Sequence, residues 1–201
     1  IAPPFQISRH PVTVAQYADF VKAGYQQRRW WSEAGWKWVQ EEKITAPASY
    51  GSLYDLPNHP QTGVSWHEAS AFAAWLADRE KLPIRLPTEA EWERAARHDD
   101  ARMYPWGEKQ PEKHANIADT GIGSPSAVGL FPSGKAECGA LDLSGNVWEW
   151  TSSPWSENYS KPAYDKQPDG QTACVLRGGA YLFHADLARC AYCGWILPHF
   201  R

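Results

Sequence analysis

Three helix starts in the first hundred residues constrain the fold most strongly. Each is a capping box, in which a hydroxyl residue is followed three positions later by Glu or Gln: Thr13 and Gln16, Ser65 and Glu68, Thr88 and Glu91. The hydroxyl can accept a hydrogen bond from the third helical amide while the longer side chain reaches back. These signals predict helices over 13–22, over 65–82 up to the proline at position 83, and from 88 to about 98.

The second predicted helix has an apolar stripe at i, i+3, i+4 spacing, made of Trp66, Ala69, Phe72, Ala73 and Leu76. Such a stripe indicates a face buried in the core. Residues 26–43 contain four tryptophans among charged residues. They suit either a loop or short helix whose indoles pack on the body, or an aromatic rim for a ligand, and packing is favoured because indoles mostly pack.

The second half of the chain looks different. Residues 99–140 lack regular periodicity and are rich in Gly, Pro and Ser, which predicts long loops that need internal tethers. The segments "CVLRGGAYLF" and "RCAYCGW" indicate short strands, the first with a Gly-Gly bend. Early helices and late strands predict an α+β fold, and the twelve tryptophans, sixteen prolines and fifteen glycines favour little regular secondary structure.

Charge and composition exclude some classes of protein. The net charge of −3 and the lack of a basic run argue against a nucleic-acid partner. No apolar run is long enough to span a membrane, and no signal peptide is visible. The chain begins at Ile1, so we expect the native N-terminus to be missing and leave the compartment open.

Cys190 and Cys193 form a CxxC, which suits a zinc half-site, a redox dithiol or, as favoured, two unrelated thiols.

The motifs "HPQTGVSWHEASAFAAWLA", "RLPTEAEWERAAR", "YPWGE", "GALDLSGNVWEWTSSPW" and "RGGAY" occur in this order. The sequence resembles the sulfatase-modifying-factor family, whose founding member is the formylglycine-generating enzyme. The resemblance extends from about Phe5 to Tyr192. It implies one C-type-lectin-like domain over 1–201, with long loops and a missing final strand.

The family resemblance implies two catalytic cysteines after a "GGSY"-like motif, which handle copper and oxygen. The corresponding positions hold Phe183 and either Leu187 or Ala188, and none of these side chains offers a thiolate. Copper is therefore not expected. Ergothioneine-type sulfoxide synthases share the fold and add an iron-binding helical domain with a His-rich motif, and this chain contains no such motif.

The end of the chain resembles the variable proteins of diversity-generating retroelements, which carry a frame like "RGG(S/A)W…ARCAYR…P". The residues between the frame positions are Tyr181, Leu182, Phe183, His184, Leu187, Cys193, Gly194, Trp195, Ile196, Leu197, His199 and Phe200. Retroelement mutagenesis at AAY codons can produce eleven of these twelve residues, with Trp195 as the exception. The resemblance thus implies a variable segment over about 181–200 that binds a ligand.

The sequence therefore predicts a non-enzymatic, receptor-like binding protein whose partner is an unknown protein or cell-surface ligand, because exposed aromatic residues mark interaction sites. Two alternatives stay open. One is a formylglycine-generating-type copper oxidoreductase that uses Cys190 and Cys193 and acts on a protein cysteine. The other is a regulatory module of a larger protein.

The family resemblance also implies structural calcium near "GNVWEW". The predicted ligands are the side chains of Asp142 and Glu149 and the carbonyls of Gly145 and Val147. A second site would use Asn116 and the carbonyl of Ile117. Hard oxygen ligands from a tight turn suit calcium. The alternative is that Asp142 and Glu149 only hydrogen-bond the turn.

Overall fold

The computed structural model describes residues 4–108, 110–157 and 171–201. Its α-helices are α1 (Val14–Ala23), α2 (Glu33–Glu41), α3 (Trp66–Glu80) and α4 (Glu89–Arg97). Its strands are β1 (Glu149–Pro154), β2 (Cys174–Arg177) and β3 (Cys193–Ile196). Short 3-10 helices η1 (Arg28–Trp30), η2 (Pro111–Lys113), η3 (Ala118–Thr120), η4 (Pro132–Gly134) and η5 (Ala185–Ala188) interrupt the loops. The predicted α+β class is confirmed.

The helices begin where their capping residues predict. Thr13, Ser65 and Thr88 are the N-caps of α1, α3 and α4, and all three capping boxes have both hydrogen bonds. The fourth helix, α2, lies in the tryptophan-rich segment and is capped by Ser32, whose hydroxyl accepts from the Gly35 amide at 3.1 Å. Ser32 has no Glu or Gln three positions later, so no capping box marks this helix start in the sequence.

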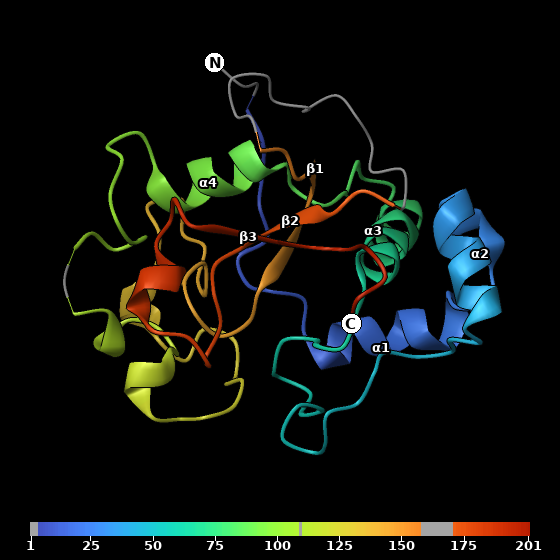
Figure 1. The fold of residues 1–201 in the computed structure, drawn as a ribbon, viewed down its shortest axis with the longest axis horizontal. Helices are drawn as coiled ribbons and strands as arrows, with labels where there is room; N and C mark the ends of the chain where they lie inside the picture. The colour runs from blue at the N-terminus through green and yellow to red at the C-terminus, as the bar shows by residue number, and fades with distance from the viewer. Residues whose placement is uncertain (1–3, 109, 158–170) are drawn as a thin grey trace.

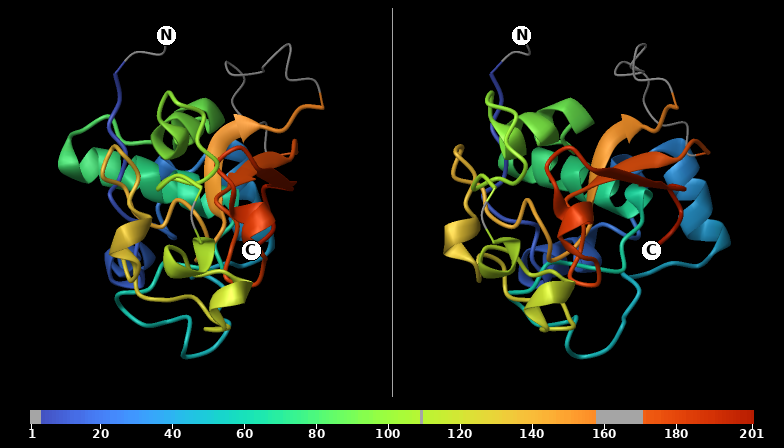
Figure 2. Two further views of the ribbon diagram at one scale, coloured as in Figure 1. Left: turned by 90° about the vertical axis from the view of Figure 1, so that its left-hand side faces the viewer. Right: turned by 60° about the vertical axis from the view of Figure 1, so that its left-hand side comes forward.

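The sheet is small and antiparallel, with strand order β1-β2-β3. In Figure 1, α1, α2 and α3 lie on one side of this sheet, and the loops between residues 104 and 145 lie on the other. The right-hand view of Figure 2 again shows α2 and the yellow part of these loops at opposite edges of the molecule. Directly after β2, Gly178 and Gly179 have φ angles of +93° and +75°, which glycine adopts without a steric penalty. The Gly-Gly bend predicted from the sequence is therefore confirmed.

Two buried clusters hold the elements together. Aromatic residues of α1, α3 and the intervening segment form the first: Tyr17, Phe20, Tyr25, Trp31, Phe72 and Trp75, with Val39 and Ala71. The second surrounds Trp92 of α4 and includes Leu143 and Cys190. Trp31 is buried and Trp30, Trp36 and Trp38 pack against the first cluster, so the indoles of residues 26–43 pack on the body as favoured.

The loops between residues 99 and 140 are tethered by stacked rings. Tyr104 stacks on Trp106 with a centroid separation of 5.1 Å, and Trp106 stacks on His114 at the same separation. His114 also bonds through Nδ1 to the Ser133 carbonyl at 2.9 Å. Side-chain stacking therefore provides tethers that loops of this length need. In the described part of the chain, no helix combines the length and apolar character needed to cross a membrane.

Candidate functional site

The bend after β2 places the segment 178–188 over a buried turn at residues 144–146. The Gly145 amide donates to the Gly178 carbonyl at 2.8 Å, and the Tyr181 amide donates to the Asn146 carbonyl at 3.0 Å. A Cβ on Gly179 would come within 2.8 Å of the Leu187 carbonyl, so glycine permits this close approach. Main-chain contacts therefore fix where the following side chains point.

Tyr181 in this segment is buried, at 8% exposure. Its hydroxyl lies 2.6 Å from the hydroxyl of Tyr54, which comes from the loop before α3. Burial, followed by the hydrogen bond with Tyr54, raises the pKa of Tyr181 to about 12. The phenol is therefore neutral at physiological pH and can donate one hydrogen bond while it accepts another.

Aromatic rings extend the site outward from Tyr181. Leu182 and Phe183 are 64% and 38% exposed. Phe183 makes an edge contact with Trp148, with centroids 5.8 Å apart, and Tyr192 lies 6.1 Å from the same indole. Trp148 thus connects the bend to the start of β3. A surface of this kind suits planar or cationic organic groups, which bind aromatic faces.

An exposed histidine lies next to these rings. The Nδ1 atom of His184 lies 3.0 Å from a carboxylate oxygen of Asp119 in η3. Because a carboxylate only accepts, Nδ1 donates in this pair, and in the neutral imidazole Nε2 then keeps its lone pair. The pair can therefore orient a proton acceptor toward a bound molecule.

The remaining residues of the predicted ligand-binding set lie elsewhere. Cys193, Gly194, Trp195 and Ile196 make up β3, which pairs with β2. Trp195 is 54% exposed and its ring lies 4.9 Å from that of Trp155. Leu197 and Phe200 are exposed, His199 stacks on Phe200, and Leu187 lies half-buried in η5. The structure therefore brings Tyr181, Phe183 and His184 next to three residues outside the predicted ligand-binding set: Tyr54, Asp119 and Trp148.

The predicted calcium ligands bond within the protein, so the structure gives no support to the predicted calcium sites. Among the described residues, no group of three or more His, Cys, Asp or Glu side chains could hold a metal ion. The protein supplies partners for the two acids: Asp142 accepts from the Gly129 amide at 2.6 Å, and Glu149 accepts from the Trp92 indole at 2.8 Å. The Asn116 carbonyl accepts from the Asn146 amide, and the Ile117 carbonyl accepts from the Thr120 hydroxyl. Gly145 and Val147 lie in the turn beneath the Gly-Gly bend.

Burial of Glu149 predicts a pH effect on stability. Desolvation raises its pKa from 4.5 to about 8, against the hydrogen bond from Trp92. Between pH 5 and 8 the unfolded chain therefore releases a proton that the folded chain keeps, so stability falls as pH rises, by up to ~1.4 kcal/mol per unit. Glu149→Gln keeps an acceptor for Trp92 without the charge. Urea titrations should show a smaller decline for this variant than for the parent, and parallel declines would contradict the prediction.

The cysteines do not form a metal-binding pair. No disulfide links Cys138, Cys174, Cys190 and Cys193. Cys190 is fully buried, and burial raises the pKa of its thiol to about 12. A thiol with this pKa offers almost no thiolate at neutral pH. The arrangement therefore gives no support to Cys190 and Cys193 as a copper pair.

The loop-rich α+β frame and the aromatic site on its C-terminal bend define the class of protein. Residues 1–201 match the sulfatase-modifying factor enzyme 1-like domain. The chain belongs to this family. It is 39% identical over 222 residues to the hercynine oxygenase of Mycolicibacterium thermoresistibile, covering 98% of this chain and 48% of that protein. It is 36% identical over 228 residues to the formylglycine-generating enzyme of Thermomonospora curvata, covering 90% and 72%.

The likeness to a variable protein is a likeness of fold. The solved structure of Treponema denticola variable protein 1 superposes with a TM-score of 0.66 and 19% identity, covering 94% of this chain and 77% of that one. Identity at this level carries no function. The match supports the predicted C-type-lectin-like fold, and the fold alone.

These comparisons overturn the predicted function. Relatives named as oxygenases and as formylglycine-generating enzymes match nearly the whole chain, so the prediction of a non-enzymatic binding protein is wrong. The prediction of structural calcium with no copper is also contradicted, because three of these relatives are named as oxygenases. The absence of the family's two catalytic cysteines argues against copper-dependent oxidation of a protein cysteine. It does not argue against other enzymatic reactions. The chain spans about half the length of the hercynine oxygenases it matches.

Proposed function

We propose that this chain is the substrate-facing domain of an oxygenase that acts on hercynine or a closely related betaine. The 39% identity to a hercynine oxygenase over 98% of the chain carries this proposal. The described residues hold no group of three metal-ligating side chains. They do not fit a complete site for an oxygen-activating metal, and we assign the metal to a part of the enzyme outside the matched half.

The candidate site suits the chemistry of this substrate. Hercynine carries a trimethylammonium group, a carboxylate and an imidazole. Aromatic faces attract a quaternary ammonium, and Trp148 and Phe183 supply such faces. The neutral Tyr181 hydroxyl can donate to a carboxylate. His184, oriented by Asp119, can accept a proton from the substrate. In this proposal the chain binds and orients the substrate, and its rings exclude water.

The first test measures oxygen uptake by the full-length enzyme supplied with ferrous iron, a thiol donor such as cysteine, and hercynine. We expect uptake that depends on hercynine and falls sharply when histidine replaces it. Uptake that ignores hercynine would contradict the proposal. Formation of an aldehyde on a sulfatase-type peptide with copper(I) would instead support the formylglycine-generating activity, which the second group of relatives favours.

A substitution tests the site itself. Tyr181→Phe removes the hydroxyl that pairs with Tyr54 at 2.6 Å and one donor to the substrate. Because a lost hydrogen bond to a charged group costs about 1.5–3 kcal/mol, the dissociation constant for hercynine should rise at least about tenfold by calorimetry. Trp195→Ala is the control, since this exposed indole packs on Trp155, outside the Trp148 group, and should leave binding unchanged. Equal losses in both variants would contradict the site assignment.

A further inference from the structure

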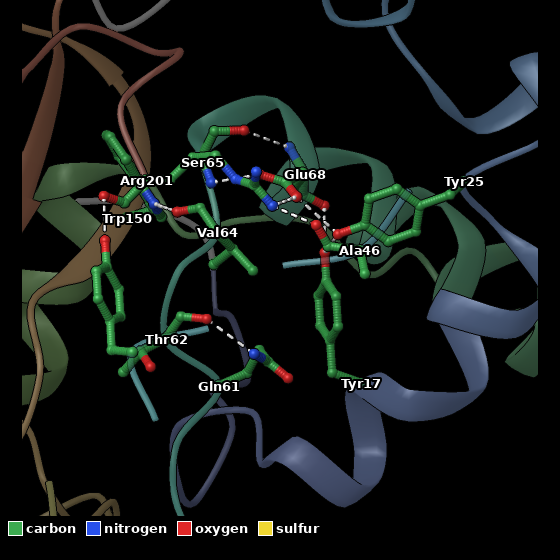
Figure 3. A network of polar contacts seen from close by, with 11 residues as sticks. Tyr17, Tyr25, Ala46, Gln61, Thr62, Val64, Ser65, Glu68, Trp150 and Arg201 are labelled. Carbon is green, nitrogen blue, oxygen red and sulfur yellow. Dashed lines mark hydrogen bonds and ion pairs between the residues drawn. The ribbon is translucent and has the colours of Figure 1, made fainter. Parts of the chain in front are cut away.

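A fully buried carboxylate lies at the start of α3. The side chain of Glu68 has no solvent exposure. One carboxylate oxygen accepts from the Ser65 amide at 2.8 Å, which closes the capping box. The other accepts from the Tyr25 hydroxyl at 2.7 Å and from the Arg201 guanidinium at 3.1 Å. Figure 3 shows the side chains of Glu68, Tyr25 and Arg201 converging on this point. The carboxylate is thus compensated by three donors, as burial requires.

The same contacts fix the position of Arg201. Its guanidinium also donates to the Ala46 carbonyl, and its side chain is only 21% exposed. The segment that leads to it is tied to α3 as well, because the Trp66 amide donates to the carbonyl of the buried Pro198 at 3.0 Å. The main-chain oxygen of Arg201 therefore has a defined place, although the residues before it are exposed.

The main-chain oxygen of Arg201 holds the loop that contains Tyr50 and Tyr54 and leads to the candidate site. The Tyr50 hydroxyl donates to the Arg201 main-chain oxygen at 2.8 Å. The Tyr50 ring contacts the Tyr54 ring at a centroid separation of 5.7 Å, and the Tyr54 hydroxyl meets Tyr181. We propose that Arg201 is a positioning residue for the candidate site, which it controls through Tyr50 and Tyr54. The role in substrate binding rests on the proposed function, whereas the placement of the tyrosines does not.

The loop tip has little else to position it. Within the part of the chain that the structure describes, and apart from the turn bond from the His59 amide to the Leu56 carbonyl, two hydrogen bonds join residues 49–56 to other segments, and they are the bonds of Tyr50 and Tyr54. Leu53 and Leu56 point to solvent at 62% and 41% exposure. The loop base is held independently, since the His59 and Pro57 carbonyls accept from the amides of Val14 and Ala15. Loss of the Arg201 contact should therefore release the tip and leave the base in place.

The experiment uses the full-length enzyme labelled with ¹³Cζ-tyrosine, with the Tyr54 and Tyr181 resonances assigned from Tyr→Phe variants. Arg201→Met and Tyr50→Phe should both shift these two resonances. Tyr50→Phe removes one hydroxyl from a side chain that is 54% exposed, so this variant folds even where Arg201→Met does not. Arg201→Lys should restore part of the effect, because an ammonium can pair with Glu68 but lacks the fork that also reaches Ala46.

Tyr25→Phe is the matched control. It removes a hydrogen bond from the same Glu68 oxygen and should lower stability without moving the Tyr54 and Tyr181 resonances. In steady-state kinetics, Arg201→Met should raise KM for hercynine about tenfold and change kcat less than twofold, the pattern of lost binding. Unchanged resonances in Tyr50→Phe would overturn the positioning role. If the resonances shift in an enzyme that does not use hercynine, the positioning role of Arg201 is upheld and only the proposed function is refuted.

Discussion

Arg177→Met should lower the free energy of unfolding by about 3–5 kcal/mol, the cost of breaking a buried ion pair. Arg177 lies in the central strand β2, and its side chain has no solvent exposure. Its guanidinium donates to a carboxylate oxygen of Glu93 and to the Tyr192 carbonyl, the latter at 2.6 Å. It also lies 5.2 Å from the centre of the Trp92 ring. Methionine would fill the space but leave Glu93 and the nearby Glu89 without this cation.

Urea denaturation with Arg85→Met as the control tests this expectation. Arg85 makes a two-pronged ion pair with Glu91, with both distances 2.7 Å, but its side chain is 59% exposed. Exposed pairs contribute at most about 1 kcal/mol. A loss of that size for both variants would show that the buried pair of Arg177 gives no more stability than a surface pair. A second substitution, Glu93→Leu, should recover part of the loss, because it removes a carboxylate that Arg177 no longer compensates and that keeps only its pair with Arg97 at 2.7 Å.

Gly145→Ala should be nearly as destabilising, by about 3–4 kcal/mol. Gly145 has φ = +76°, and a Cβ there would lie 2.3 Å from the Asn116 carbonyl oxygen. The left-handed conformation costs alanine about 1–2 kcal/mol. Relief of the clash would also break the bond from the Asn146 amide to Asn116, now 2.7 Å, at a further ~1–3 kcal/mol. Because Tyr181 bonds to the Asn146 carbonyl, the candidate site should be disturbed as well.

The control for this substitution is Gly121→Ala. Gly121 has a similar φ of +71°, but no atom lies within 4 Å of a Cβ built there. Chemical denaturation gives the loss of unfolding free energy for each variant. Both variants have the backbone strain, so the difference between the two losses measures the cost of the clash with Asn116. We expect Gly121→Ala to lose only the conformational cost, about 1–2 kcal/mol. Equal losses would mean that the turn relaxes around the added methyl group.

The sequence was most informative where the determinants are local. A capping box lies within four residues, so α1, α3 and α4 could be located from Thr13, Ser65 and Thr88. The Gly-Gly bend was recognisable for the same reason. The site could be predicted only in part, because it depends on long-range contacts. Tyr54 and Tyr181 are 127 positions apart, and neither lies in a segment whose periodicity indicates a partner.

The wrong function has a physical explanation. Phe183 occupies the position where the resemblance implies a catalytic cysteine. The prediction of a non-enzymatic protein depends partly on this residue, because its side chain has no metal-binding atom. A domain can contribute substrate-binding surface while the metal ligands come from elsewhere in the protein, and composition does not reveal that division. Leu182 and Phe183 are exposed, as a ligand-binding surface requires, but exposure alone does not separate a receptor from an enzyme.

The main-chain bonding of the bend has a consequence for evolution. The Tyr181 amide bonds to Asn146, and the Phe183 carbonyl accepts from the Ala118 amide at 2.9 Å. Any amino acid other than proline at position 181, and any residue at 183, could keep these bonds, since they use backbone atoms. The outward side chains at 182–184 are thus largely uncoupled from folding, and selection can change their chemistry without first repairing stability. One scaffold can then pass between catalysis and recognition by small steps, each of which leaves a folded protein.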